Sequence, residues 1–129
     1  MAFPSTGGGY QFTDGNVNEV ASIIQGAPVA ASAAATLTAA QLTSGLIVGS
    51  GTPATQTLPT VALLEALLVN AKVDSGFDVS FVNTAASTLT VATGTGWTLV
   101  GVATILTLVS STWRARKTGD GAWSFYRIS

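Results

Sequence analysis

The side chains that could do acid–base chemistry are few in this chain and widely spaced. The 129 residues include six carboxylates and no histidine. Asp74 and Asp78 are the closest carboxylate pair, but they flank a turn at Gly76, which indicates solvated side chains. Cleavage of glycosides needs two carboxylates that face each other across a cleft. Without histidine, the chain also lacks the usual general base and the commonest metal ligand. We therefore expect no catalytic residue.

A metal site is the second chemistry that the sequence could carry. Hard cations such as calcium take oxygen ligands of the kind found at Asp14, Asn16, Asn18 and Glu19. The spacing of these residues does not match the twelve-residue calcium loop, and hydrogen bonds in turns and helix caps also favour these residue types. The chain has no cysteine, so thiolate ligands and disulfides are excluded. We expect neither a metal nor a cofactor.

Nucleophilic and phosphate-binding motifs are also missing. The sequence contains no Gly-x-Ser-x-Gly elbow, and no histidine could activate a serine. Glycine pairs occur at 49–51 and 94–96, but neither is followed by the Gly-Lys-Ser/Thr of a phosphate-binding loop. These glycines indicate turns and loops. The sequence predicts that the protein is not an enzyme.

One basic cluster stands out near the C-terminus, at Arg114, Arg116 and Lys117. On a β-strand Arg114 and Arg116 share one face. They could form cross-strand ion pairs on a solvated edge hairpin, with Asp120 across the turn and Arg127 on the last strand. Alternatively, Arg114 and Arg116 could contact an acidic surface of a partner protein. A net charge of -1 gives no electrostatic reason to expect nucleic acid or an anionic membrane.

Two long stretches carry no charge at all, from Val20 to Leu64 and from Val79 to Trp113. Only 9% of the residues are charged, against about a quarter in an ordinary globular domain. Sparse charge promotes association, so much of the surface should be covered by other protein. We expect the first half of the first stretch to be buried against another chain. In the second stretch, threonine and serine should keep the outer face soluble.

The mean hydropathy of +0.50 raises the question of a membrane segment. The longest strongly apolar run, Leu99 to Val109, is about half of the roughly 20 residues that a spanning helix needs. The first residues also lack the basic and then apolar layout of a signal peptide. The sequence predicts no membrane association.

The sequence predicts one helix. Thr60 is a good N-cap residue, and Val61, Leu64 and Leu67 recur at helical spacing. The helix should run from Thr60 to Asn70.

Most of the remaining chain has the composition of β-strands. Threonine, valine and isoleucine favour a pleated surface. Hydrophobic residues alternate over 77–84 and again over 88–93, which predicts a hairpin turned at 85–87. Two short strands are expected on either side of a turn at 43–45, the first with Thr36, Thr38 and Leu42 and the second with Leu46, Ile47 and Val48. Further strands are expected at 102–109, 112–116 and 123–128.

The predicted fold is mainly β, an antiparallel sandwich or small barrel with one short helix and an extended N-terminal arm. The arm covers residues 1–33 and the β domain covers residues 34–129. Phe3, Tyr10 and Phe12 lie on a glycine-rich part of the arm. Such residues can anchor an extended segment in pockets of a partner protein, so we expect these three to be partner contacts.

Three segments of the chain resemble small structural proteins of tailed bacteriophages, of the capsid decoration and head-fibre type. Phe12–Glu19 (FTDGNVNE) resembles their N-terminal Gly-Asp-Gly-Asn-x-x-Glu segment, with Thr13 in place of the first glycine. Thr57–Val82 resembles a stretch with Leu-Pro-Thr, a helix, Asn-Ala-x-Val and Gly-x-x-Phe. Trp113–Ile128 (WRARKTGDGAWSFYRI) is similar to their closing hairpin. The resemblance covers most of the chain from Phe12 and assigns no binding residue.

What the resemblance implies is a virion protein of the phage head exterior. Decoration proteins of this kind are typically β-rich homotrimers that clamp the major capsid protein. The alternative is a head-fibre or tail module that binds a receptor or glycan through exposed tryptophans, for which Trp97, Trp113 and Trp123 are the candidates. A third hypothesis, a hydrolase of cell-wall polymer, conflicts with the missing histidine and the unpaired carboxylates.

Overall fold

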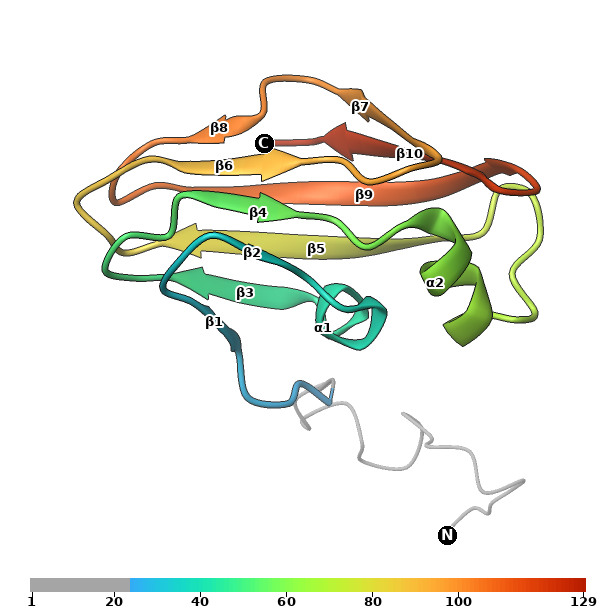
Figure 1. Cartoon of the computed structure of the whole chain (residues 1–129), viewed down its shortest axis with the longest axis horizontal. Helices are drawn as coiled ribbons and strands as arrows, with labels where there is room; N and C mark the ends of the chain where they lie inside the picture. The colour runs from blue at the N-terminus through green and yellow to red at the C-terminus, as the bar shows by residue number, and fades with distance from the viewer. Residues whose placement is uncertain (1–23) are drawn as a thin grey trace, which may run out of the picture.

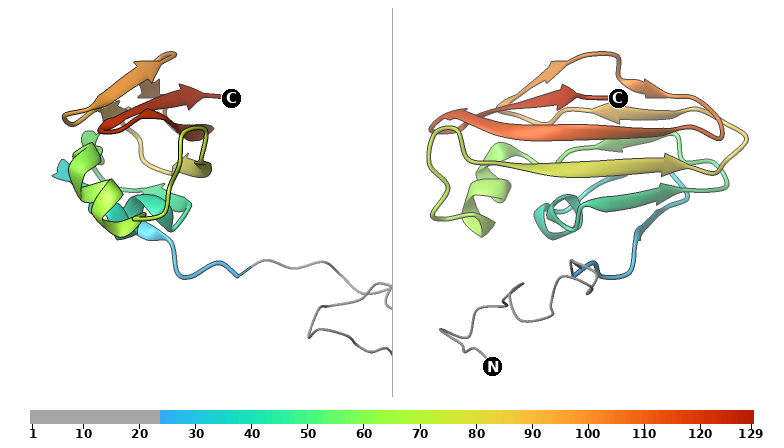
Figure 2. Two further views of the ribbon diagram at one scale, coloured as in Figure 1. Left: turned by 90° about the vertical axis from the view of Figure 1, so that its right-hand side faces the viewer. Right: turned by 180° about the vertical axis from the view of Figure 1, so that it is seen from behind.

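The computed structural model describes residues 24–129, which fold into two facing β-sheets with two short helices (Figure 1). The larger sheet has six strands, in the order β1 (Val29–Ala31), β3 (Leu46–Gly49), β5 (Gly76–Asn83), β9 (Ser110–Gly119), β10 (Ala122–Arg127) and β7 (Trp97–Val100). The smaller sheet has four strands, in the order β2 (Ala35–Thr36), β4 (Thr55–Thr57), β6 (Leu89–Ala92) and β8 (Thr104–Ile105). Figure 2 shows the two layers end-on and from behind. The predicted mainly-β sandwich is confirmed.

The chain passes from one sheet to the other after almost every strand. β1, β3 and β5 lie parallel in the larger sheet, while β2, β4 and β6 lie parallel in the smaller one. The first half of the domain is therefore a coil of three similar turns. Helix α1 (Ala39–Thr43) connects the first turn to the second, and α2 (Val61–Leu67) connects the second to the third. Ala31, Gly49 and Asn83 occupy equivalent places in the three turns.

The pairing of strands differs from the antiparallel arrangement expected from the sequence, because five of the eight pairings are parallel. The expected hairpin through 85–87 is wrong, since β5 and β6 lie in different sheets. Asn83 forms the corner between them: its Nδ2 donates to the carbonyls of Ser87 (2.8 Å), Ile105 (3.1 Å) and Leu106 (3.1 Å). Within residues 24–129, β9 and β10 form the tight antiparallel hairpin, joined at residues 120–121.

The core lies between the two sheets and is rich in aromatic side chains. Along β9 the inward-facing side chains alternate with Arg114 and Arg116, which point outward. Trp113 stacks on Phe125 at 5.0 Å between ring centroids, and Trp97 meets the edge of Phe125 at 5.5 Å. Such contacts add to the energy of burial. The other large buried side chains include Phe81, Leu42, Ile47, Leu58, Leu64, Leu89 and Ile105.

Both helices begin at a threonine cap. The predicted helix is confirmed as α2, with Thr60 Oγ1 accepting from the Leu63 amide at 3.3 Å. Of the two strands expected around the turn at 43–45, the second is confirmed as β3, whereas α1 takes the place of the end of the first. Thr38 and Gln41 form a reciprocal capping box there, with bonds of 3.0 and 3.1 Å. A Thr-x-x-Gln spacing is the sequence signal that could have revealed α1.

The chain enters the described structure along the edge of the larger sheet. Residues 24–28 form no helix or strand, and β1 then pairs in parallel with β3. Part of the segment expected to be an arm thus contributes a thin strand to the chain's own sheet. Phe3, Tyr10 and Phe12 lie outside the described residues. Over residues 24–129, both helices are too short to cross a bilayer.

Candidate functional site

The two arginines expected to contact a partner lie next to each other on the outer face of β9, and both are held by aspartates. Arg114 makes a two-pronged contact with Asp78, at 2.7 Å from Nε and 3.1 Å from Nη2. Arg116 Nη2 lies 2.7 Å from Asp74. The hydrogen bond from Arg114 lowers the pKa of Asp78. These pairs link β9 to β5 and the loop before it, whereas the expected pairing of the basic cluster with Asp120 is made by Lys117, at 3.5 Å.

A second polar cluster joins α2 to the β9–β10 hairpin around Lys117. This buried lysine donates to the Ala71 carbonyl at 3.0 Å and lies 3.4 Å from Glu65 and 3.5 Å from Asp120. Glu65 also accepts hydrogen bonds from Trp123 Nε1 (3.1 Å) and from the Gly121 amide. Burial raises the pKa of Glu65, but these bonds and the Lys117 ammonium outweigh it and leave that pKa lowered.

The chemistry available to these groups is limited. Within residues 24–129, each of the four carboxylates faces a lysine or arginine, and no group of three or more potential metal ligands occurs. The described carboxylates therefore act as ion-pair partners within the fold. This placement joins segments far apart in the sequence, which is why the sequence alone could not reveal the Glu65–Lys117 cluster.

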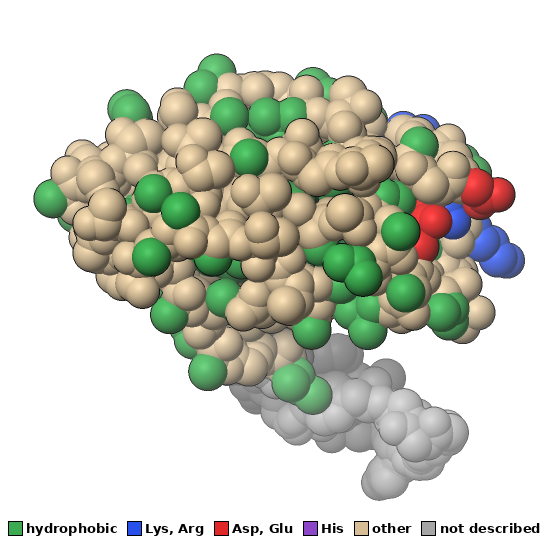
Figure 3. Space-filling model, in the orientation of Figure 1, with side chains coloured by type: hydrophobic (Ala, Val, Ile, Leu, Met, Phe, Trp, Pro, Cys, Tyr) green, Lys and Arg blue, Asp and Glu red, His purple; other side chains and the backbone are tan. Residues whose placement is uncertain are grey.

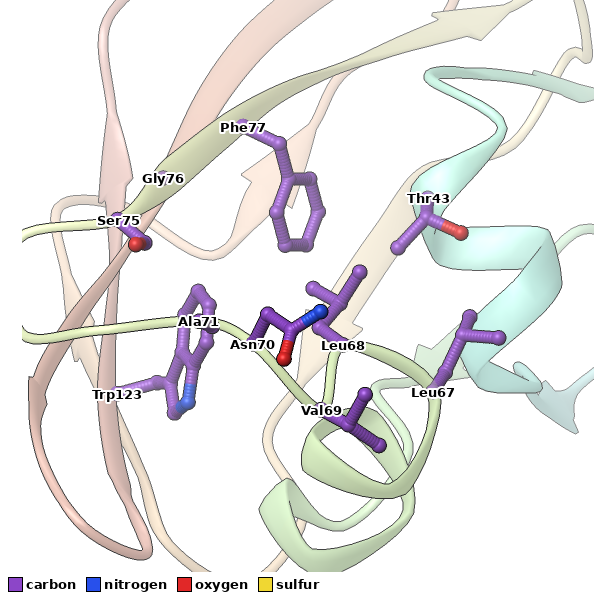
Figure 4. Close-up of a pocket in the computed structure, with 10 residues that line it drawn as sticks. All are labelled: Thr43, Leu67, Leu68, Val69, Asn70, Ala71, Ser75, Gly76, Phe77 and Trp123. Atoms are coloured by element: carbon purple, nitrogen blue, oxygen red, sulfur yellow. The ribbon is translucent and has the colours of Figure 1, made fainter.

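An apolar groove is a further candidate for a binding site. It has a volume of about 530 Å³ and lies between the two helices and the start of β5. Figure 4 shows Phe77 and Trp123 on one side of it, with Leu67, Leu68 and Val69 on the other. Its lining is mainly hydrophobic, the usual character of a site for an apolar group. We call this cavity the α1–α2 groove.

The exposed apolar surface of the domain is concentrated along residues 100–109. We call it the apolar edge, and it comprises Val100, Val102, Leu106, Leu108 and Val109, together with Ile128. β7 and β8, which border it, are the edge strands of the two sheets and lie on the same side of the sandwich (Figure 1). The expectation that threonine and serine cover this charge-free stretch is wrong for these positions.

Leu108 is the most unusual member of the apolar edge. Its backbone has a φ of +59°, in the left-handed region that side chains other than glycine rarely adopt. Its side chain is nonetheless 79% exposed, so burial within this chain does not offset the strain. Strained backbone of this kind clusters at functional positions such as active sites, ligand clamps and switch regions.

Most of the described charged side chains lie away from the apolar edge, and Arg127 is the exception, because its Nη1 donates to the carbonyls of Val102 (3.0 Å) and Thr104. Figure 3 shows the acidic and basic side chains at one end of the visible face, near α2 and the turn between β9 and β10. From Val79 to Trp113 the chain carries none. The visible face is thus divided into a charged end and an uncharged, partly apolar remainder.

The three tryptophans proposed as an exposed platform are all buried. Trp97 donates to the Pro59 carbonyl at 2.7 Å, Trp123 donates to Glu65, and Trp113 is stacked beneath Phe125 with the Arg127 guanidinium 5.7 Å from its ring. They serve the core and cannot stack on an external sugar.

Comparison with known proteins adds no guide to function. The chain matches no known protein family, and neither a curated protein nor a solved structure is detectably similar to it. The function must therefore be argued from the surfaces described above.

Proposed function

We propose that this protein is a structural virion protein, a decoration protein of the outer phage head. In this proposal three copies associate through the apolar edge into a homotrimer. The N-terminal arm then attaches the trimer to the major capsid protein, with Phe3, Tyr10 and Phe12 as anchors. The observation that carries the proposal is the apolar edge, with the strained and exposed Leu108 within it.

The apolar edge is large enough to take part in a protein interface. Six aliphatic side chains at these exposures present on the order of 600 Å² of apolar surface, the upper end of what a monomer usually shows. A standard protein interface takes about 800 Å² from each partner. The apolar edge and the backbone around it are therefore large enough to form most of one interface.

The distribution of charge supports association between copies of the chain. The four carboxylates of residues 24–129 pair with Arg114, Arg116 and Lys117. Arg127 is bonded to the backbone of the apolar edge, at the Val102 and Thr104 carbonyls, so the large hydrophobic side chains of that edge are left with one neighbouring charge. The resemblance of 12–19, 57–82 and 113–128 to phage structural proteins is the reason to place this assembly on a virion.

The alternative, a receptor- or glycan-binding module of a head fibre or tail, loses its main support. It relied on exposed tryptophans, and all three are buried. An enzymatic role has no candidate site among residues 24–129, where the carboxylates are paired with cations.

Binding to expanded phage heads that lack decoration tests the role of the arm. The full-length protein should bind and co-sediment with the heads. A triple variant, Phe3→Ala, Tyr10→Ala and Phe12→Ala, should lose this binding while keeping the solution mass of the parent. Undiminished binding by the triple variant would overturn the assignment of the arm. Failure of the unchanged protein to bind any such head would overturn the virion role itself.

A further inference from the structure

We propose that the α1–α2 groove binds the Phe12 side chain of the same chain. In the free protein Phe12 would then be held on its own domain while Phe3 and Tyr10 remain available to the partner, and on the capsid Phe12 would have to leave the groove to serve as the third anchor. Occupation of the groove by Phe12 can be measured in the free protein and does not depend on capsid binding.

The groove has the chemistry of an aromatic site. The Phe77 and Trp123 rings on one side of it lie 5.9 Å apart, and Trp123 in turn lies 6.0 Å from Trp97. A further ring placed against Phe77 would extend this cluster at the spacing that aromatic rings prefer. A cavity of ~150 Å³ is enough to hold benzene, so 530 Å³ accommodates a phenyl ring together with its neighbouring backbone.

The rim of the groove is left uncovered by the described residues. Leu67 is 49% exposed and Val69 is 73% exposed, although both line an apolar cavity. An occupant that covered them would remove apolar area from water, which is favourable by ~25 cal/mol per Å². Figure 4 shows these two side chains on the helix side of the groove, where they would contact the outer edge of a bound ring.

The chain arrives at the described structure beside this groove. Gln25 Nε2 donates to the Ser44 carbonyl at 3.0 Å, and Ser44 directly follows Thr43, a lining residue. Of the aromatic residues before Gln25, Phe12 is the nearest in sequence, thirteen positions away. A segment of that length has a typical end-to-end distance of ~20 Å, so the groove lies within its reach. Such a short tether gives an effective concentration in the millimolar range.

Charge around the groove also suits this segment. Lys72 lies in the loop that borders the groove, and none of the carboxylates of residues 24–129 pairs with it. Asp14 follows Phe12 by two residues, and Glu19 lies between Phe12 and Gln25. With Phe12 in the groove, both acidic side chains would lie on the tether between the groove and Gln25.

The first test is the indole N–H signal of Trp123 in NMR spectra of the full-length protein, assigned with Trp123→Phe. Phe12→Ala should shift this signal, and Tyr10→Ala should not. Leu67→Glu should reproduce the shift of Phe12→Ala, because it places a charge on the groove rim. Leu63→Glu is the matched control: it lies one turn earlier on α2, is 59% exposed and does not line the groove. An unchanged signal in Phe12→Ala would overturn the proposal.

The second test identifies whose segment is bound. Because the chain has no cysteine, Thr13→Cys gives a single site for a nitroxide beside an intact Phe12. Isotope-labelled, spin-labelled chains are refolded with a tenfold excess of unlabelled, unmodified chains. The Trp123 indole signal should stay broadened after this dilution. Loss of broadening on dilution would show that a neighbouring copy fills the groove. No broadening before dilution would show that this segment does not bind there. Either result refutes the proposal.

Discussion

The buried side-chain amides of two residues hold the connections by which the chain passes from one sheet to the other. Asn83 and Gln56 are almost completely buried, and each donates to carbonyls of the connections between strands. A buried carbonyl that loses its donor costs about 1–3 kcal/mol. The sequence showed Asn83 only as the last member of an alternating strand. Its role depends on residues 105 and 106, more than twenty positions away, so no local pattern could predict it.

Asn83→Leu should therefore be strongly destabilising. Three carbonyls lose their donor, and the larger side chain has no space in the corner, so we expect a loss of about 2–4 kcal/mol. Thermal unfolding followed by circular dichroism measures it. Asn70→Leu, at an exposed position, is the control and should change stability by less than about 0.5 kcal/mol. Equal melting temperatures for the two variants would contradict this role of Asn83.

Glu65 makes stability depend on acid pH. Its pKa in the folded protein lies below the ordinary value of 4.5, so its ionised form favours the folded state. This contribution is complete above the unfolded-state pKa and is lost as the pH falls through the folded-state pKa. Denaturant unfolding between pH 7 and pH 2.5 should show Glu65→Gln as less stable at pH 7. The difference should shrink at the acid end, and a constant difference would contradict the assignment.

At the scale of elements, the sequence predicted the types of strand and helix better than their arrangement. The two-residue alternation marks β5 and β6 correctly, because each strand has one face in the core. It does not distinguish a hairpin within one sheet from a corner between two sheets, since both give the same alternation. The threonine cap and the Val61–Leu64 spacing predicted α2, whereas the shorter α1 was missed despite its capping box.

Close backbone approach at β5 gives a test of the strand arrangement. A Cβ added at Gly76 would lie 2.5 Å from the Ala115 carbonyl oxygen on β9, closer than the backbone can accommodate without moving. Gly76→Ala should lower stability by about 2 kcal/mol or more. Gly119→Ala is the control, since a Cβ there meets nothing within 4 Å. Chemical denaturation compares the two, and similar midpoints would argue against the β5–β9 register.

At the scale of the whole molecule, the structure shows which parts of this weakly charged surface are apolar. The sequence pointed to the N-terminal third as the covered region. Among residues 24–129 the exposed large hydrophobic side chains gather along the apolar edge and on and after α2, with Ile24 also exposed. That another chain covers the N-terminal third stays a prediction. Most of the charge on the visible face lies at one end, and the apolar edge carries Arg127 as its neighbouring charge, a division that suits an ordered assembly.

The mass of the protein in solution tests this account most directly. Sedimentation equilibrium of the full-length chain should give three times its 13.0 kDa mass. Leu106→Asp places a charge on the apolar edge at a side chain that is 62% exposed, so it should leave the fold intact and reduce the mass to that of one chain. Leu63→Asp, equally exposed on α2, should remain a trimer. A monomeric parent protein, or a Leu106→Asp variant that keeps the mass of the parent, would contradict the central claim that the apolar edge is covered by other copies.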